Sequence, residues 1–319
     1  MASMMRLVAD IGGTHARFAL VAANSLEPEH EKTVRCADYE SLEHAVRSYL
    51  RETGEPVIRE AALAVATNVT GDFVHLTNGP WGFSIEQTRQ VLDLERLHVV
   101  NDFTALALAV PTLRPDELSK IGGGAALPAT PIAVIGPGTG LGVSGLIPVQ
   151  KGWVALQGEG GHAAFSPTDE REVGALRWLQ RRYDHVSVER VVSGMGLQNL
   201  YHALCDMDGA QPRSLDPNQI SAAALAGSDA QCMAALEMFC AILGAAAANL
   251  VLTLGAQAGC YIGGGIVPQL GEYFARSAFR PRFESAGRFS RYVAAVPTYV
   301  ILARTPALRG LATLLNQSA

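Results

Sequence analysis

The order of apolar and polar segments along the chain predicts alternating strands and helices. Residues 5–23 form an apolar run, a glycine turn and a second apolar run, which is typical of two strands joined by a turn. Val57–Thr67 predicts a buried strand, and Val99 and Val100 predict a short strand leading into Asn101 and Asp102. Helical spacing predicts three helices, at Ser41–Glu52, at Ser84–Leu92 with Ser84 as N-cap and Gln87 three residues on, and at Thr104–Val110 before Pro111.

The opening pattern recurs in the middle of the chain. Residues 131–149 again form an apolar run, a glycine turn and an apolar run, which suggests a duplicated core with one copy in each domain. A connection rich in proline and glycine precedes it at Arg114–Ala129, and we expect its Gly122–Gly124 run to be flexible. The remaining residues predict a loop at Gly158–His162, a helix near Thr168–Tyr183, a polar loop around Glu189, a long apolar helix, a strand at Cys260–Ile262, a turn at Gly263–Gly265 and a final helix near Ala307–Asn316.

The length of 319 residues exceeds what one hydrophobic core usually supports, so two α/β domains are expected. We predict a small domain at residues 1–110, joined by the C-terminal helix at about 300–319, and a large domain at residues 111–299. Sheets of this kind bind ligands at the carboxyl ends of their strands. We therefore expect ligands at the carboxyl ends of these strands.

One apolar segment, Met238–Ala256, carries no charge over about the length of a bilayer span. Its many alanines and glycines contribute little transfer energy compared with leucine. Asn249 lies inside the segment and Glu237 adjoins it. We therefore predict a tightly packed core helix rather than a membrane span.

Composition and charge exclude several functional classes. Hydrophobic residues make up 49% of the chain, which is enough for a large core and excludes disorder. The net charge is -5 and no basic run occurs, so we expect neither nucleic acid nor a membrane surface as a partner. The five cysteines form no C-x-x-C pair and the N-terminus lacks a signal peptide, so we expect a cytoplasmic protein with reduced thiols. The chain has three lysines, Lys32, Lys120 and Lys151. None of them lies in a P-loop or in a protein-kinase motif.

Three glycine clusters are candidate nucleotide-binding loops, because glycine lets backbone N–H groups approach phosphate oxygens with no Cβ in the way. In the first cluster, Gly12 and Gly13 form the turn, and Thr14 and Arg17 add hydrogen-bond donors. Asp10, at the end of the preceding strand, can hold a hydrated Mg²⁺ ion. A plain hairpin with a Gly-Gly turn fits the same residues equally well.

The second cluster contains Gly138, Thr139 and Gly140 and is similar to another phosphate cradle. Residues 140–145 also match the dinucleotide motif G-x-G-x-x-G, with an acidic residue near the expected distance. That motif requires a helix to begin in the glycine turn. The residues that follow are β-like and include Pro148, so we exclude a dinucleotide fold.

The third cluster, Gly263, Gly264 and Gly265, follows a predicted strand. Backbone without side chains offers a flat surface against which a nucleobase or ribose can lie. A simple tight turn is the more common explanation of such a run.

Three carboxylates are candidate catalytic or binding groups. Asp102 follows a buried strand and precedes an apolar helix, where it can accept a proton from a substrate hydroxyl or simply cap the helix. Glu159 and His162 have the E-x-x-H spacing of metal sites on helices, but the two glycines between them favour a hydrogen-bonding loop. With Glu189, such a loop suits a sugar, because each sugar hydroxyl both donates and accepts.

Taken in order, several strings make the chain resemble the bacterial glucokinase family, the hexokinase-type sugar kinases with the actin-like ATPase fold. They run from LVADIGGTHARFAL through TGDFVHLTN, NDFTALALAV, IGPGTGLGVSGL, GEGGHAAFSP and VSVERVVSG to YIGGGIVP, over nearly the whole chain. The resemblance implies an α/β protein of two actin-like ATPase (ribonuclease H-like) domains with a cleft between them. It also implies a cytoplasmic homodimer that phosphorylates glucose at O6 with ATP and Mg²⁺, giving glucose 6-phosphate for glycolysis.

The resemblance also implies roles for individual residues. Asp102 becomes the general base, and Mg²⁺ is bound by Asp10 through water. The glucose ligands are Asn101, Asp102, Glu159, His162 and Glu189. The nucleotide ligands are Asp10, Gly12, Gly13, Thr14, Arg17, Gly138, Thr139, Gly140, Gly263, Gly264 and Gly265.

Three positions depart from the family pattern. His15 stands where asparagine is usual, and Ala9 stands where glycine is common before Asp10. Thr67–Val69 replaces a turn that usually contains proline. The first two departures lie in the first phosphate loop and are expected to affect ATP affinity, whereas none removes a sugar ligand.

Other functions remain open at this point. The substrate can be another hexose such as mannose or fructose, and a sugar-sensing regulator or a nucleotide-dependent oxidoreductase fits parts of the pattern. The related ROK sugar kinases and repressors carry a cysteine-rich zinc motif just after the E-G-G-H loop. Ala163–Pro167 follows that loop here and the next cysteine is Cys205, so we expect no structural zinc. A repressor also needs a helix-turn-helix, for which the residues before Asp10 leave no room.

Overall fold

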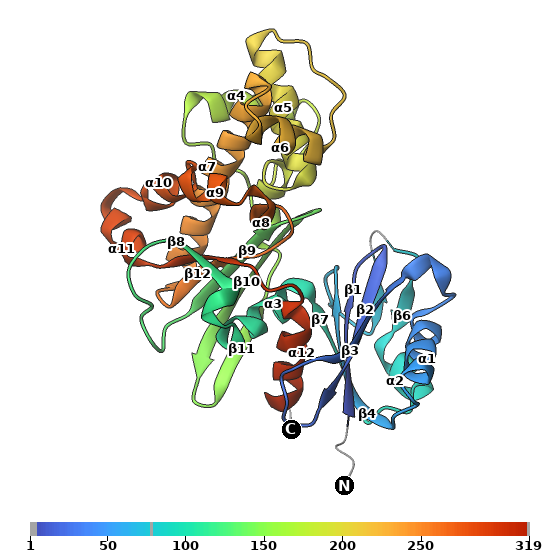
Figure 1. Ribbon diagram of the computed structural model, residues 1–319. Coiled ribbons are helices and arrows are strands. Elements are labelled where there is room, and N and C mark those ends of the chain that lie inside the picture. Colours follow the sequence, from blue (N-terminus) through green and yellow to red (C-terminus); the bar gives the residue numbers. More distant parts are fainter. Residues whose placement is uncertain (1–4, 77–78, 318–319) are drawn as a thin grey trace. The chain divides into compact units, whose positions relative to one another are not determined.

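The computed structural model describes residues 5–76 and 79–317, which form two units, each a mixture of strands and helices (Figure 1). Relative to the predicted domains, the main difference is that β11 (Gly152–Gln157) belongs to the first unit, because it packs against α3 (Asp102–Ala109). The first unit consists of the residues up to Arg114, Val149–Gln157 and the residues from Ala303 onward, and the second consists of Pro115–Pro148 and Gly158–Leu302.

The sheet of the first unit has five strands, in the order β3 (Glu29–Arg35), β2 (His15–Ala22), β1 (Met5–Ile11), β4 (Ile58–Val65) and β7 (Arg96–Asn101). β1 pairs antiparallel with β2 and parallel with β4, and β4 pairs parallel with β7. The glycine turn after β1 therefore lies at the edge of the sheet where β4 and β7 also end. A separate small sheet contains β5 (Phe73–His75) and β6 (Gly82–Ser84).

Helices cover both faces of this sheet, because alternate residues of each strand point to opposite sides (Figure 1). α1 (Leu42–Glu52) packs on the face to which Leu7 of β1 belongs. α3 and α12 (Pro306–Gln317) pack on the other face, where Leu308 joins Val8 in the core. The N-caps of α1 and α2 (Ile85–Val91) are Ser41 and Ser84, as the sequence predicted.

The second sheet repeats the arrangement of the first. Its order is β11, β10 (Leu141–Val149), β9 (Ile132–Pro137), β12 (Gly259–Ile262), β13 (Thr298–Ile301) and β8 (Leu118–Gly122). β9 pairs antiparallel with β10 and parallel with β12, just as β1 pairs with β2 and β4. The structure thus confirms that the strand–glycine turn–strand pattern occurs twice with the same pairing.

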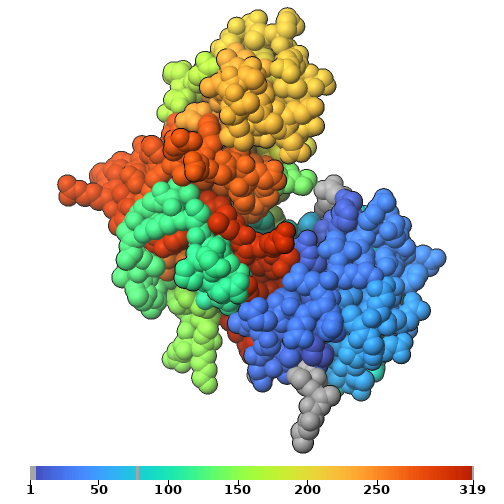
Figure 2. Space-filling view, in the orientation of Figure 1, coloured from blue at the N-terminus to red at the C-terminus, as the bar shows by residue number. Residues whose placement is uncertain are grey.

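Most helices of the chain lie in the second unit. α5, α6 and the beginning of α7 pack together at one end of it, yellow in the space-filling view (Figure 2). The helices are α4 (Glu170–Gln180), α5 (Gly194–Asp208), α6 (Pro217–Leu225), α7 (Ala230–Leu254), α8 (Val267–Leu270), α9 (Glu272–Arg276), α10 (Phe279–Glu284) and α11 (Ser290–Ala295).

α7 contains the long apolar segment. By length and composition alone it could cross a membrane. In the structure Leu236, Phe239 and Leu243 are fully buried in the core of the second unit, so α7 is the packed core helix that the sequence predicted. The helix begins at Ala230 rather than near residue 238, because Asp229 caps its first turn.

The predicted flexible connection is wrong for Gly122–Gly124. β8 pairs antiparallel with β13 at the edge of the second sheet, with Gly122 opposite Thr298. Gly123 has a φ of 86°, and the N–H of Gly124 donates to the carbonyl oxygen of Ala295 at 2.9 Å. The partner strand lies far away in sequence, so local composition could not reveal this ordered edge.

Two predicted helices have different bounds in the structure. α4 is shorter than the predicted 168–183 segment, because Asp169 is its N-cap. α3 begins at Asp102 rather than at Thr104, because the side chain of Asn101 caps it.

Candidate functional site

The first glycine turn joins β1 to β2. Asp10 is opposite Arg17 in the register of the two strands, and the N–H of Gly12 donates to the carbonyl of His15 at 2.9 Å. Burial raises the pKa of Asp10, and the positive charge of Arg17 partly offsets this. Thr14 and His15 are exposed, so their side chains reach solvent at this edge.

The two departures near this turn occupy different environments. Ala9 is fully buried in the core beside the strand residues Phe18 and Leu63, so its methyl group packs inside the unit. His15 is exposed at the start of β2. Of the two, His15 is therefore the one with a side chain in contact with solvent next to the turn.

Asn101 and Asp102 mark the junction between β7 and α3. Ile11 of β1 pairs with Val65 of β4, which pairs with Asn101, so all three strands end at one edge. The amide oxygen of Asn101 accepts from the N–H of Phe103 at 2.9 Å, and its amide nitrogen donates to the carbonyl of a residue in the loop after β4 at 3.3 Å. Asn101 is therefore the helix cap, and Asp102 occupies the first helical position.

The electrostatics of Asp102 suit proton transfer near neutral pH. Burial and the negative charge of Asp10 together raise the pKa of Asp102 to about 6, while the N–H of Phe103, 2.9 Å from Oδ1, lowers it. Both carboxylates lie in the first unit at the same end of its sheet. A carboxylate of this kind stays largely ionised at pH 7 and is a stronger base than an ordinary exposed aspartate.

Two loops of the second unit bring Glu159, His162 and Glu189 together. The first contains the short turn Gly160–His162 and the second the turn Val188–Arg190. Backbone hydrogen bonds join the loops, from Val188 N–H to the carbonyl of Ala163 at 2.9 Å and from Phe165 N–H to the carbonyl of Val186 at 2.9 Å. Glu159 and His162 are exposed and Glu189 is half-buried, which leaves all three accessible to a ligand.

The second glycine turn contacts both of these loops. The N–H of Gly138 donates to the carbonyl of Gly140 at 2.8 Å, and the N–H of Leu141 donates to Oε2 of Glu189 at 2.8 Å. A Cβ on Gly161 would lie closer than 3.0 Å to the carbonyl oxygen of Leu141. Gly161 is therefore needed for close packing of backbone on backbone.

The third glycine run packs against the second. Gly263 donates its N–H to the carbonyl of Ile135 at 2.9 Å. Gly264 has a φ of 78°, and a Cβ there would lie closer than 3.0 Å to the carbonyl oxygen of Pro137. Gly265 is exposed and has open space around its Cβ position. The run is a tight turn that also leaves bare backbone at the surface.

A cavity of about 610 Å³ lies beside the second and third glycine turns. Gly138, Thr139 and Gly265 line one part of it. The residues that line the rest were not predicted as site residues, because the helices that carry them have no recognisable motif. These include Met195 and Gln198 of α5, Asn218, Ser221 and Leu225 of α6, and Gln269 of α8.

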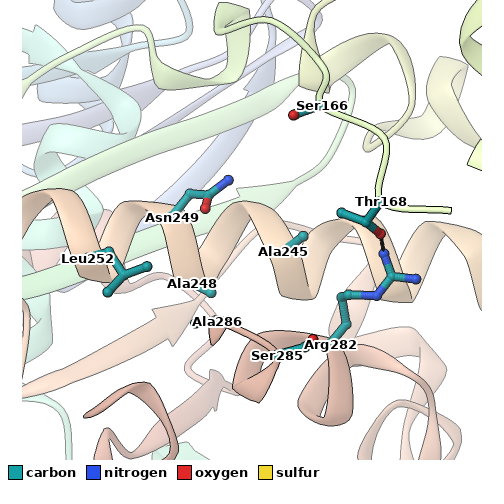
Figure 3. Close-up of a pocket in the computed structure, with 9 residues that line it drawn as sticks. All are labelled: Ser166, Thr168, Ala245, Ala248, Asn249, Leu252, Arg282, Ser285 and Ala286. Carbon is teal, nitrogen blue, oxygen red and sulfur yellow. Dashed lines mark hydrogen bonds between the residues drawn. The ribbon is translucent and has the colours of Figure 1, made fainter. Parts of the chain in front are cut away.

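A second cavity of the same unit, about 500 Å³, is lined by none of the predicted site residues. It lies between α7, which contributes Asn249, and α10, which contributes Arg282 (Figure 3). Figure 3 shows the Arg282 guanidinium reaching Thr168, to which it is hydrogen-bonded. The same guanidinium is paired with Asp169 and with the buried Glu172, so its charge is neutralised within the protein.

Comparison with known proteins identifies the family. A family model described as Glucokinase matches residues 7–318. The glucokinase of Chromobacterium violaceum is 52% identical over 307 residues, which are 96% of this chain and 88% of the relative. The crystal structure of a glucokinase from an Antarctic psychrotroph has a TM-score of 0.90 and 38% identity, covering 98% of this chain and 99% of that one.

A more distant structure shares the fold. The glucokinase of Balamuthia mandrillaris, crystallised in complex with glucose, has a TM-score of 0.80 at 20% identity and covers 99% of this chain and 94% of that one. The family match and the relatives agree over almost the full length of the chain. The protein therefore belongs to the glucokinase family and has its two-domain actin-like ATPase fold.

Proposed function

We propose that the protein transfers the γ-phosphoryl group of ATP to O6 of glucose, giving glucose 6-phosphate and ADP. Beyond family membership, one observation carries the proposal. The half-buried carboxylate of Asp102 lies at the carboxyl edge of the first sheet with its pKa raised to about 6. A base of that strength can take the O6 proton as the phosphoryl group arrives.

In this proposal five residues bind the sugar: Asn101, Asp102, Glu159, His162 and Glu189. The hydrogen bonds of the Asn101 amide to Phe103 and to Thr67 use one lone pair of its oxygen and one of its two amide hydrogens. Its amide also donates to the Asp102 carboxylate, which lowers the pKa of Asp102. The second lone pair of its oxygen is left to accept from one sugar hydroxyl. The close packing of the Glu159 and Glu189 loops supports their binding neighbouring hydroxyls of one small ligand.

We further propose that ATP occupies the cavity beside the second and third glycine turns. The cavity volume of about 610 Å³ and its mixture of apolar and amide side chains suit a nucleoside. Gly138, Thr139 and Gly140 would hold the phosphates, and Gly263, Gly264 and Gly265 would face the adenosine. In the first unit, Gly12, Gly13, Thr14 and Arg17 would bind the phosphates with backbone and side-chain donors.

Mg²⁺ is part of this proposal, with Asp10 as its protein ligand through water. The residues fit the ion, because Asp10 is an oxygen donor whose ionised form is disfavoured by burial and would be stabilised by a cation. When bound, Mg²⁺ supplies charge neutralisation at the phosphate oxygens. Phosphoryl transfer has a loose transition state, so the remaining tasks of the chain are positioning of both substrates and acceptance of one proton by Asp102.

The test is the substitution Asp102→Asn. We expect it to keep glucose binding, measured by calorimetry, and to lower kcat by at least about a hundredfold, because only the proton acceptor is lost. Asp38→Asn is the matched control, since Asp38 is an exposed aspartate of the same unit. Near-normal turnover of Asp102→Asn would refute the assignment of the base.

The sugar and the cellular setting are tested separately. A coupled ADP-release assay with glucose, mannose, fructose and N-acetylglucosamine should give the highest kcat/KM with glucose.

We also propose a cytoplasmic location, which is supported by five buried cysteines that form no disulfide. A homodimer is proposed from the family resemblance, and sedimentation at several concentrations tests it.

A further inference from the structure

We propose that Glu189 couples the sugar site to the nucleotide site, so that glucose and ATP each tighten the binding of the other. In this role Glu189 is a positioning residue for the phosphate turn Gly138–Leu141 as well as a sugar ligand. The inference rests on the proposed function, because it takes glucose as the ligand of Glu189.

The first link is a hydrogen bond from the phosphate turn to the carboxylate. Leu141 is the residue with which β10 begins, directly after Gly140, and its N–H donates to Oε2 of Glu189 at 2.8 Å. A Cβ on Gly140 would lie closer than 3.0 Å to the same oxygen. The carboxylate therefore fixes the end of the turn and occupies the space that any side chain at position 140 would need.

The second link runs through the backbone to α5. The hydroxyl of Ser193 donates to the carbonyl of Glu189 at 2.8 Å and accepts from the N–H of Gly196 at 2.9 Å, which caps α5. The N–H of Gly194 donates to the carbonyl of Gly138 at 2.9 Å. Glu189, the first turn of α5 and the phosphate turn are thus joined in a closed hydrogen-bonded ring.

This ring borders the nucleotide cavity. Gly138 and Gly194 line the cavity, as does Met195 in the first turn of α5. No more than two hydrogen bonds therefore separate the Glu189 carboxylate from groups that would contact ATP. A shift of the carboxylate is transmitted to those groups. The coupling path is short and lies entirely within the second unit.

The two oxygens of the Glu189 carboxylate differ in their hydrogen-bond partners. Oε2 is bound to Leu141, whereas the hydrogen bonds recorded over residues 5–76 and 79–317 include none to Oε1. A sugar hydroxyl that donates to Oε1 would hold the carboxylate in one rotamer and so hold the Leu141 N–H and the turn. ATP then binds to an ordered turn and loses less conformational entropy, which makes the cooperativity positive. By thermodynamic linkage, the nucleotide tightens glucose by the same factor.

The primary test measures the dissociation constant of glucose by calorimetry, with and without saturating AMPPNP and Mg²⁺. The wild-type protein should bind glucose at least about fivefold more tightly with the nucleotide. Gly140→Ala should weaken glucose binding by about tenfold or more even without nucleotide, because its Cβ displaces the carboxylate. The control variant is Gly71→Ala, which lies outside the proposed sites and whose Cβ would have no neighbour within 4 Å. It should leave nucleotide-free glucose binding within about twofold.

A second pair of variants keeps the inference testable should Gly140→Ala misfold. Glu189→Gln keeps an oxygen that can accept from Leu141 and should retain most of the coupling factor, although its glucose affinity falls. Glu189→Ala should bind AMPPNP with the same affinity in the presence and absence of glucose. The inference is overturned if wild-type protein binds glucose but shows no coupling, or if Glu189→Ala retains it. Failure of the wild-type protein to bind glucose would instead refute the proposed function.

Discussion

Partial burial, together with the negative charge of Asp10 at the same edge of the first sheet, raises the pKa of Asp102 to about 6. The pair connects the proposed metal-binding carboxylate with the proposed base. The strand register places both residues at this edge, because β1 and β7 flank β4 and all three strands end together. The pH behaviour of the enzyme should therefore report on this edge.

The first prediction concerns the pH dependence of the rate. Asp102 must be ionised to accept the O6 proton, so kcat/KM for glucose should fall as the pH decreases through about 6. An initial-rate series from pH 5 to 8 with saturating ATP and Mg²⁺ measures this, with the coupling enzymes checked at each pH. A rate that stays constant across that range would contradict the role of Asp102.

The second prediction concerns stability. The folded-state pKa of Asp102, about 6, lies above its ordinary value of 3.8, so ionisation of Asp102 opposes folding. This cost is absent below pH 3.8, grows between pH 3.8 and about 6, and is complete above about 6. Asp102→Asn should therefore be more stable than the wild type at pH 7.5, by at most about 3 kcal/mol.

Urea titrations at pH 4 and pH 7.5 measure how the stabilisation by Asp102→Asn depends on pH. The stabilisation by Asp102→Asn should be larger at the higher pH. The Asp38→Asn control should shift both midpoints equally, because Asp38 is exposed. A larger stabilisation at pH 4 would show that ionisation of the Asp102 carboxylate does not oppose folding.

The third prediction separates two neighbouring glycines of the third turn. Gly264→Ala should lower the free energy of unfolding by about 2 kcal/mol or more, because a Cβ there would clash with the Pro137 carbonyl and the φ is 78°. Gly265→Ala should unfold close to the wild type, since a Cβ at position 265 would have no neighbour within 4 Å. Equal unfolding midpoints for the two variants would refute the close backbone approach.

The fourth prediction concerns the packing of α12 on α3. A Cβ on Gly310 would lie closer than 3.0 Å to the backbone carbonyl of Ala105. Gly310→Ala should therefore lower the free energy of unfolding by about 3 kcal/mol, measured by urea titration. Gly174→Ala in α4 is the control, because its Cβ would meet only the end of the flexible Met207 side chain. That variant should change stability by no more than about 1 kcal/mol.

The sequence predicted the features that depend on local patterns. The two strand–glycine turn–strand motifs, the serine caps of α1 and α2 and the junction at Asn101 were all recognisable from a few adjacent residues. Features that depend on distant partners were not. The composition of Arg114–Ala129 predicts a connection, whereas β8 lies within it and pairs with β13, a strand that follows α11 far along the chain.

The site shows the same limit. Glu189 was predicted as a sugar ligand, but its bond to Leu141 joins residues 48 positions apart and no spacing rule indicates it. Asp102 could be a base or a cap from sequence alone, and the structure gives the cap to Asn101. Met195 and Gln198 were missed because only the packing of α5 against the glycine turns places them at a cavity.

The position of α12 has a consequence for synthesis on the ribosome. Val8 and Ala62 of the first unit are covered by Leu308 and Leu311 of α12, so the part of that sheet face not covered by α3 stays exposed until residues 306–317 emerge. The second unit is made of residues that are all translated before α12. The first unit is begun first and completed last, so a nascent chain must keep the apolar face of its opening strands from aggregating while the second unit is translated.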